Sequence, residues 1–197
     1  MLLGINTVGA PYGVMGGEGF PHFVSSFSSE RGEDLIPLLQ RICPEGPSSL
    51  EGIFITTGPG RFTLLRMGVT AGKGLGHFLG IPIMEVTTLE WGAYQIKKEG
   101  TILAYLPFKE VLWAEFFTRE KDRWETVCRC ASYTKEELLH KVETYRPDWA
   151  IGPSPLDGLY TPFLQIPDLD YNTFFALGKK KWQAHQFVEP NRLLPIY

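Results

Sequence analysis

The sequence predicts an α/β protein made of two related lobes, and two observations support that fold class. The 197 residues are 44% hydrophobic and 21% charged, a composition typical of a folded globular chain long enough for two small domains. The order strand, strand, strand, helix, strand also occurs in each half, although no residue-level repeat is visible. We therefore expect one lobe over residues 1–100 and a smaller one over residues 101–197, with the last helix free to return to the first lobe.

The elements of the first half follow from apolar runs and turn residues. Short apolar runs bounded by glycine, proline and polar residues predict four strands, at Met1–Asn6, Tyr12–Gly17, Phe20–Phe27 and Gly52–Thr56. Apolar residues at helical spacing predict a helix over Gly32–Cys43. Pro37 is tolerated in that helix only if it lies in the first turn, where its missing N–H would have no partner in any case.

The second half repeats this order. Its apolar runs predict strands at Thr101–Leu106, Val111–Thr118, Trp124–Cys130 and Asp148–Ile151, with a charged turn over Arg119–Arg123. Thr134 followed by Glu137 has the spacing of a capping box and predicts a helix that ends near Tyr145. A further helix is expected over Asp170–His185, followed by a short extended segment at Leu193–Tyr197.

The stretch between the two halves is the richest in glycine. It is predicted to hold a Gly58-Pro59-Gly60 turn, a helix over Phe62–Leu79, a strand over Ile81–Val86 and a helix from Thr88. Neither nucleotide-binding fingerprint fits this stretch. Gly72-Lys73-Gly74 is not followed by Ser or Thr, and no G-x-G-x-x-G opens a helix directly after a strand.

Three glycines of the predicted helix, Gly68, Gly72 and Gly76, recur every four residues and therefore lie on one face. Each interior glycine costs a helix about 1 kcal/mol relative to alanine, so close packing must compensate. Two interpretations remain open. The smooth face packs on the protein's own sheet, or it forms an interface with another protein together with the helix over Gly32–Cys43.

The run from Gly58 to Glu90 resembles the bacterial TsaB (YeaZ) family. That family carries GPG, a small residue and FTG, then LR, IG, A-KGL, LGIP and V-STLE in this order. The matching positions are Gly58, Pro59, Gly60, Phe62, Thr63, Leu65, Arg66, Gly68, Ala71, Lys73, Gly74, Leu75, Leu79, Gly80, Ile81, Pro82, Val86, Thr88, Leu89 and Glu90. About half of the chain is covered well, and Phe117–Gln186 matches only in outline.

The resemblance implies a two-lobed fold of the actin/Hsp70/sugar-kinase type, which is a duplicated ribonuclease-H-like α/β fold. It also implies a role in making N6-threonylcarbamoyladenosine at position 37 of tRNA. In that pathway the TsaB-like protein is a non-catalytic partner of its paralogue TsaD, and the ATPase TsaE joins the pair. TsaB-like proteins pair with TsaD, or with themselves, through two helices that correspond here to Gly32–Cys43 and Phe62–Leu79.

On that basis a partner interface is predicted on nine residues of the two helices. They are apolar or glycine residues, namely Leu35, Leu38, Leu39, Ile42, Leu65, Gly68, Val69, Gly72 and Gly76. Gly72→Leu is then expected to block pairing with TsaD while the isolated protein stays folded. Contact with tRNA is expected only through the complex, although the basic run Lys179–Lys181 beside Trp182 leaves a direct contact open.

Several residues depart from the family pattern where a nucleotide site would lie. The usual Asp of the first strand is Asn6, and the acidic residue of the second lobe aligns with Tyr105. Arg61 and Leu64 stand where the family has a small residue and a glycine. Mg²⁺–nucleotide chemistry needs carboxylate oxygens near the phosphates. We therefore predict no catalysis by this chain alone and no cofactor; the alternative is an actin-like nucleotide hydrolase or kinase.

Other signals for chemistry are weak. The histidines His22, His77, His140 and His185 lack the i, i+4 spacing of a helical metal site, and Cys128-x-Cys130 lacks a second ligand pair, so no metal is predicted. Three cysteines favour a reducing compartment, and a net charge of −3 excludes a wholly basic surface. No apolar run approaches the roughly 18–20 residues of a membrane span, and no signal peptide is recognised. We expect a cytoplasmic protein without membrane contact.

Overall fold

The computed structural model describes residues 1–8, 12–17, 21–27, 35–43, 46–121, 123–165 and 170–197. The chain divides into two compact units. Unit 1 comprises Met1–Thr88 and Leu169–Tyr197, and unit 2 comprises Leu89–Asp168. Helix α3 (Thr88–Gln95) therefore groups with unit 2 from its second residue onward, whereas helix α5 (Tyr171–Gln183) groups with unit 1.

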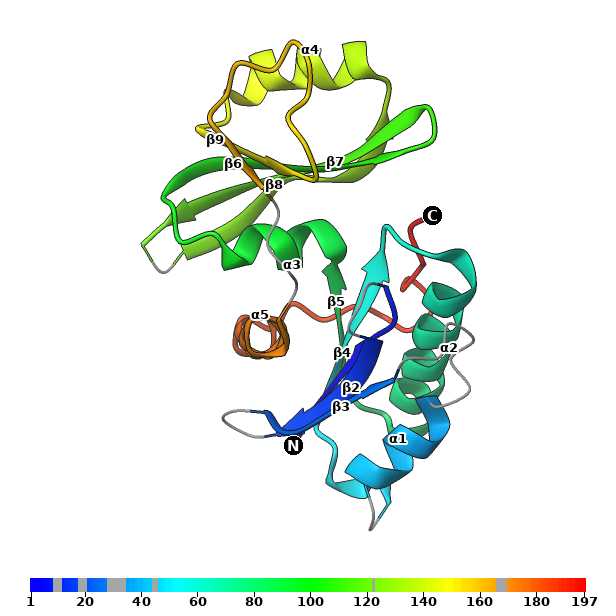
Figure 1. The fold of residues 1–197 in the computed structure, drawn as a ribbon. Helices are drawn as coiled ribbons and strands as arrows, with labels where there is room; N and C mark the ends of the chain where they lie inside the picture. Colours follow the sequence, from blue (N-terminus) through cyan, green and yellow to red (C-terminus); the bar gives the residue numbers. More distant parts are fainter. Residues whose placement is uncertain (9–11, 18–20, 28–34, 44–45, 122, 166–169) are drawn as a thin grey trace. The chain divides into compact units, whose positions relative to one another are not determined.

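A five-stranded sheet forms the centre of unit 1 (Figure 1). Its strands in spatial order are β3 (Pro21–Phe27), β2 (Tyr12–Gly17), β1 (Leu2–Asn6), β4 (Gly52–Gly58) and β5 (Ile83–Thr87). The first three pair antiparallel, whereas β4 is parallel to β1 and β5 is parallel to β4. Helices α1 (Leu35–Ile42) and α2 (Phe62–Leu79) cover one face of this sheet, and α5 covers the other.

Two neighbouring residues of β4 divide the core of unit 1 between the two faces. The ring of Phe54 lies 4.9 Å from that of Phe174 in α5, measured between centroids. The adjacent Ile55 instead meets Gly72 of α2 through its Cδ1 atom. Because side chains alternate along a strand, these neighbours point to opposite sides of the sheet. The sheet therefore carries an apolar layer on each face, and β1 and β4 are buried along their whole length.

Unit 2 has its own five-stranded sheet (Figure 1). The spatial order is β10 (Phe163–Gln165), β9 (Trp149–Gly152), β6 (Gly100–Phe108), β7 (Val111–Glu120) and β8 (Arg123–Tyr133). Phe116 packs on Tyr145 of α4 (Lys135–Tyr145), with ring centroids 4.7 Å apart. Its neighbour Phe117 stacks on Trp124, which meets Tyr94 of α3 on the opposite face.

The two sheets share one topology. In each unit the first three strands form an antiparallel meander, and two further strands run parallel to the first strand on its other side. A helix joins the third strand to the fourth in both units. Numbered within its own unit, each sheet therefore has the order 3-2-1-4-5. The duplicated element order predicted from the sequence is confirmed.

The local signals for helix boundaries are confirmed as well. The helix predicted over Phe62–Leu79 has those bounds in the structure. The backbone N–H of Glu137 donates to Thr134 Oγ1 at 3.2 Å, and the backbone N–H of Thr134 donates to the Glu137 carboxylate at 2.8 Å, which completes the capping box. Helix α1 is described over Leu35–Ile42, with Pro37 as its third described residue. The start predicted at residue 32 lies outside the described residues.

Two features of unit 2 differ from the sequence prediction because no local pattern specifies them. The sequence predicts no strand at Phe163–Gln165, because three residues carry no detectable period; β10 exists through parallel pairing with β9. The charged turn predicted over Arg119–Arg123 is shorter in the structure: Arg119 and Glu120 belong to β7, Arg123 begins β8, and Lys121 lies in the turn. Arg119 is buried between the rings of Tyr94 and Trp124, and its Nη2 donates to the Tyr94 carbonyl at 2.8 Å near the C-terminal end of α3. Ring stacking and the helix end stabilise a charge that the sequence pattern assigns to solvent.

The inward face of α2 explains three of its four interior glycines. A Cβ on Gly68 would overlap Thr7 Oγ1 and lie 2.8 Å from Thr7 Cγ2. A Cβ on Gly72 or Gly76 would lie 2.6 Å from the Cδ1 atom of Ile55 or Ile83 respectively. These glycines let the helix approach its own sheet closely. Gly74 is different, because no atom lies within 4 Å of the place its Cβ would take.

We predict opposite effects of alanine at these two kinds of position. Gly68→Ala should lower the free energy of unfolding by about 1–3 kcal/mol, because the β-branched Thr7 side chain cannot move away. Gly74→Ala should raise it by about 1 kcal/mol, because alanine favours a helix and meets open space. Urea denaturation followed by circular dichroism measures both values. Equal effects of the two substitutions would contradict the packing described here.

Candidate functional site

The nine residues predicted as a partner interface lie mostly inside the fold. Eight of them are buried, and the remaining one, Leu39, is partly buried. The buried residues are Leu35, Leu38, Ile42, Leu65, Gly68, Val69, Gly72 and Gly76. They form the core between the two helices and the sheet of unit 1. Of the two interpretations of the glycine face, packing on the protein's own sheet is therefore the one the structure has.

The expectation for Gly72→Leu changes accordingly. Because Ile55 already contacts the place of the missing Cβ, a leucine side chain would have to enter the core. Overpacking of this kind destabilises a fold. We therefore expect Gly72→Leu to destabilise the isolated protein, so that loss of pairing in this variant would not by itself locate a partner surface.

An apolar stripe runs along the outward face of α2. It consists of Met67, Ala71, Gly74 and Phe78, at spacings of four, three and four residues, and we call it the outer stripe. The Phe78 side chain is 82% exposed, which is unusual for a phenylalanine in a folded protein. Ile36 of the neighbouring helix α1 is 58% exposed. Met67 and Ala71 are partly buried against the core, so the exposed large apolar side chains of the two helices are Ile36, Phe62 and Phe78. Exposed apolar side chains of this size favour an interaction surface.

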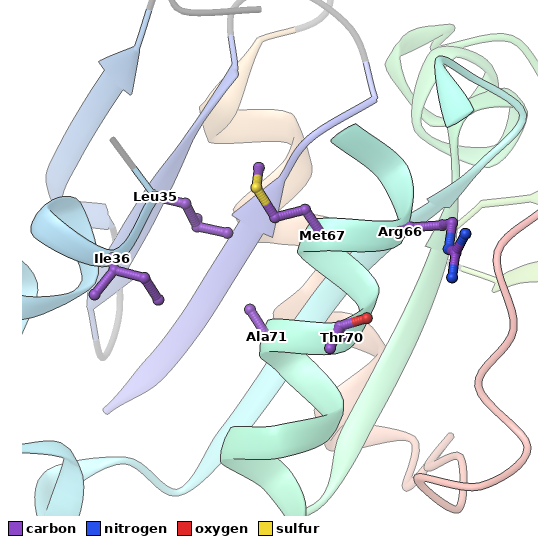
Figure 2. A pocket seen from close by; sticks show the side chains of 6 residues that line it. All are labelled: Leu35, Ile36, Arg66, Met67, Thr70 and Ala71. Atoms are coloured by element: carbon purple, nitrogen blue, oxygen red, sulfur yellow. The ribbon is translucent and has the colours of Figure 1, made fainter. Parts of the chain in front are cut away.

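A shallow groove of about 400 Å³ lies between α1 and α2 beside this stripe (Figure 2). Its lining residues are Leu35, Ile36, Arg66, Met67, Thr70 and Ala71. Leu35 and Ile36 approach from α1, and Met67 and Ala71 from α2, so that the groove is mostly apolar. The Arg66 side chain points away from α1. The dimensions and the helical walls suit one side of an amphipathic partner helix.

Gly74 belongs to the outer stripe, and no contact with the described residues requires a glycine there. An exposed helical glycine costs about 1 kcal/mol relative to alanine. Nothing in the described part of the protein approaches it. Because glycine has no side chain, the backbone of another helix can approach α2 closely at this position. Gly74 is the feature of this face that the monomer leaves unexplained.

Basic residues flank the outer stripe on the other side of α2. Arg66, Lys73 and His77 follow one another at spacings of seven and four residues, and we call them the basic flank. Neither α1 nor α2 contains an Asp or Glu. The segment Leu193–Tyr197, predicted to be extended, lies along this flank, where Lys73 Nζ donates to the Leu193 carbonyl at 3.1 Å.

The same segment reaches the start of α2. The backbone N–H of Ile196 donates to the Thr57 carbonyl at 2.7 Å, at the end of β4. A Cβ on Gly58, whose φ is +105°, would collide with the Ile196 carbonyl oxygen. The ring of Tyr197 lies 4.4 Å from that of Phe62, measured between centroids.

The family motif also has a structural basis in this region. Thr88 Oγ1 donates to the Pro59 carbonyl at 2.9 Å, which ties the start of α3 to the Gly-Pro-Gly turn. A Cβ on Gly60 would lie 2.5 Å from Val8 Cγ1. The glycines of the turn are therefore required by close contacts on both sides. The two ends of the matching run are held together in space.

Asn6 ends β1, the first strand of unit 1, and Tyr105 lies three residues before the end of β6, the first strand of unit 2. Asn6 is fully buried, its Oδ1 accepts from the backbone N–H of Val8 at 3.2 Å, and Tyr171 hydrogen-bonds to its side chain. Tyr105 is buried in unit 2, and its hydroxyl donates to the Ser154 carbonyl at 2.5 Å. Burial raises the pKa of the Tyr105 hydroxyl. Both side chains are engaged within their own unit.

These two positions do not fit a Mg²⁺–nucleotide site. A carboxamide and a neutral phenol replace the two carboxylates, and Mg²⁺ prefers charged oxygen ligands. In addition, a Cβ on Gly152 would lie 2.7 Å from the Tyr105 ring, so that the phenol fills the end of the second sheet. Residues 9–11, which follow β1, lie outside the described residues.

The other departures from the family pattern are accommodated locally. Leu64 is buried in the first turn of α2, where it adds apolar packing. Arg61 is the N-cap residue of α2 and makes no side-chain cap hydrogen bond.

The remaining sequence candidates do not come together as a site. Cys128 Sγ lies 3.6 Å from the Tyr133 hydroxyl, and burial together with the nearby Glu115 raises the pKa of Cys130. The thiolate that a metal requires is thereby disfavoured. Among the residues that the structure describes, no three His, Cys, Asp or Glu side chains gather as metal ligands.

The basic run Lys179–Lys181 lies on α5, where all three side chains are half-buried. Trp182 packs under Gly52, with its Cζ3 atom 2.6 Å from the place of a Cβ, and against Phe187. This ring is used in the fold and is not presented for stacking on a base. In the described part of the chain, no helix is both long enough and apolar enough to span a bilayer.

Comparison with solved structures identifies the fold class. YeaZ from Pseudomonas aeruginosa superposes with a TM-score of 0.77 at 17% identity, over 100% of this chain and 98% of that chain. A second Pseudomonas aeruginosa structure, described as similar to peptidase YEAZ, gives a TM-score of 0.71 at 18% identity. Together with the duplicated 3-2-1-4-5 sheets, these matches confirm the two-lobed actin/Hsp70/sugar-kinase type of α/β fold.

Comparison of sequences supports the resemblance noted in the sequence. The family model for TsaD, tRNA N6-adenosine threonylcarbamoyltransferase, matches residues 21–108. The tRNA threonylcarbamoyladenosine biosynthesis protein TsaB is 27% identical in Escherichia coli, over 61% of this chain, and 24% identical in Buchnera aphidicola, over 59%. The alignments cover 55% and 57% of those two proteins, so the chain spans just over half of their length. The predicted relationship to the TsaB (YeaZ) family is confirmed.

The sequence predicts the two helices, and it places the predicted interface on the side of α2 that packs inward. The four-residue glycine repeat is conspicuous, and it marks the side that packs inward. The outer stripe carries a usable signal of its own, since residues 67, 71, 74 and 78 have the spacing of one helical face. This signal is hard to separate from the glycine repeat, because α2 has glycines on its inward face and also, at Gly74, in the outer stripe.

Tyr105 is predicted to have a structural role that can be measured. Tyr105→Phe should lower the free energy of unfolding by about 1–2 kcal/mol at neutral pH, because the Ser154 carbonyl loses its donor. Tyr160→Phe is the control, since Tyr160 is 98% exposed. Because burial raises the pKa of Tyr105, its contribution is present below about pH 10 and is lost above it, so the two proteins should converge in alkali. Equal stability of both phenylalanine variants at neutral pH would exclude this role.

Proposed function

We propose that this chain is a TsaB-like subunit that pairs with a TsaD-like paralogue in the synthesis of N6-threonylcarbamoyladenosine at position 37 of tRNA. The observation that carries the proposal is the outward face of α1 and α2. It presents exposed apolar side chains, a groove and a glycine with open space around it. The match of the TsaD family model and the names of the TsaB relatives support the choice of pathway.

The proposed contact is helix against helix. The outer stripe and Ile36 would supply the apolar centre, and Gly74 would let a partner backbone approach. Burial of exposed apolar surface contributes about 25 cal/mol per Å² before the cost of association is subtracted. Polar residues around the stripe, including Arg66 and Thr70, would form the rim.

The contribution to the reaction is positional. Three inward glycines hold α2 tightly on its own sheet, so its outward face is a rigid platform. A rigid surface that binds one conformation of a partner raises the population of that conformation. The chain would thus stabilise the active form of the paralogue without acting on substrate itself. The hydrogen-bonded Asn6 of β1 and Tyr105 of β6 support a non-catalytic role.

The other members of the assembly remain part of the proposal. A TsaE-like ATPase would join through the paired subunits, and tRNA would be contacted only through the complex. A second copy of this chain is the competing occupant of the same face. A cytoplasmic location follows from the tRNA substrate of the proposed pathway.

A leucine on the outer stripe should block pairing. Gly74→Leu leaves the monomer at least as stable, because leucine favours a helix and the space is open. It should weaken binding to the full-length TsaD-like paralogue of the same organism about tenfold or more. Isothermal titration calorimetry measures the affinity. The matched control is His140→Leu, an exposed position on α4 of unit 2. Unchanged affinity of the Gly74→Leu protein would place the contact elsewhere.

A second test addresses the nucleotide alternative. Calorimetric titration of the purified chain with ATP and Mg²⁺ should give no saturable heat, and phosphate release should stay at background. The physical reason is the replacement of both carboxylates by Asn6 and Tyr105. Mg²⁺-dependent turnover that disappears on Thr57→Val, a change at the end of β4, would favour the nucleotide hydrolase instead.

A further inference from the structure

Arg66 stands at the rim of the groove with its charge uncompensated. Its side chain is exposed and lines the groove beside Met67 and Thr70. Its guanidinium carbon lies 5.2 Å from the centroid of the Phe62 ring. In the described part of the chain, no carboxylate lies within ion-pair distance of it. Arginine pairs with a carboxylate through two parallel hydrogen bonds when one is available.

A chain of contacts holds this arginine in place. Phe62 lies beneath the guanidinium, and Tyr197 packs on Phe62 with ring centroids 4.4 Å apart. Tyr197 is itself fixed by its neighbour Ile196, whose N–H donates to the Thr57 carbonyl at 2.7 Å. Phe62 and Tyr197 are 53% and 41% exposed. Arginine and aromatic side chains that are ordered before binding are the residue types found at the energetic centres of interfaces.

The charges carried by α1 and α2 themselves bear on the choice of partner. The ionisable side chains of α1 and α2 are Arg41, Arg66, Lys73 and His77, and none is acidic. A second copy docked symmetrically on this face would bring the same basic flank opposite itself. Like charges brought together at an interface weaken it, whereas a partner with acidic residues is attracted.

We propose that Arg66 is the anchor for a carboxylate on the partner, with Phe62 and Tyr197 as positioning residues. The occupant of the groove is then a helix with an apolar stripe that fits between α1 and α2 and an acidic residue beside the stripe. This deepens the proposed function and rests on it, since it states what the face selects. It also makes a different protein, and not a second copy, the occupant.

The first experiment reverses the charge. The full chain is titrated by calorimetry with the full-length TsaD-like paralogue of the same organism. Arg66→Glu should weaken binding about 30-fold, and Arg66→Lys about threefold to tenfold, because lysine keeps the charge but loses the planar stacking and the paired hydrogen bonds. Arg129→Glu on β8, an exposed arginine of unit 2, is the matched control and should leave the affinity unchanged.

The second experiment tests the positioning residues. Tyr197→Ala should weaken binding about threefold to tenfold, whereas Tyr197→Phe keeps the ring and should bind as the wild type does. The wild-type affinity should fall as NaCl is raised from about 0.05 to 0.5 M, and Arg66→Ala should remove most of that dependence. A merely structural role of Tyr197 would lower the melting temperature of the isolated chain and leave the salt dependence as it is.

The outcomes separate this inference from the proposed function. If Gly74→Leu blocks binding and Arg66→Glu binds within twofold of the wild type, the docking face stands and the anchor is overturned. If neither change matters, both proposals fail. Size-exclusion chromatography with light scattering tests the second copy. A wild-type dimer that Gly74→Leu dissociates and Arg66→Glu leaves intact would overturn the inference in favour of self-association.

Discussion

The rest of unit 1 depends on how closely α2 lies on its sheet. Thr7, Ile55 and Ile83 occupy the space that the side chains of Gly68, Gly72 and Gly76 would need, so helix and sheet are in contact along three successive turns. Backbone packing of this kind compensates for the low helix propensity of glycine. It also removes adjustable side chains from the contact, which leaves the helix little freedom to slide or rotate. The position of every outward-facing residue of α2 follows from this one constraint.

Close packing of α2 on the sheet makes its outward face rigid. The outer stripe lies on a helix whose position is fixed by the sheet beneath it. Helix α1 forms the other wall of the groove, and the segment Leu193–Tyr197 lies along the basic flank. A surface that is ordered before binding lowers the entropic cost of association, which favours this face for the proposed contact. The same rigidity explains why an exposed glycine is tolerated in the middle of an 18-residue helix. Its cost is small beside the packing on the other side.

The two sheets share one topology, and the first strand of each carries a buried polar side chain. Both units have the strand order 3-2-1-4-5. Asn6, at the end of β1, is bonded to Val8 and Tyr171, and Tyr105, in β6, is bonded to Ser154. Buried polar groups with satisfied hydrogen bonds stabilise a core. Asn6 and Tyr105 are thus part of the core of their own units.

The sequence alone determined the elements whose signals are local and strong. The α2 bounds, the Thr134–Glu137 capping box and the repeated order of strands and helices all depend on residues close together in the chain. The TsaB-like motif from Gly58 to Glu90 likewise gave the family, because it is one continuous run. Only the tertiary structure decided which side of α2 faces inward, since a glycine repeat specifies close approach without specifying to what. Tertiary contacts also created β10, buried Arg119 between two rings, and brought Tyr197 to Phe62 across 135 residues of chain. Each of these features is a contact between residues that are distant in the sequence, and such contacts cannot be predicted from a local pattern.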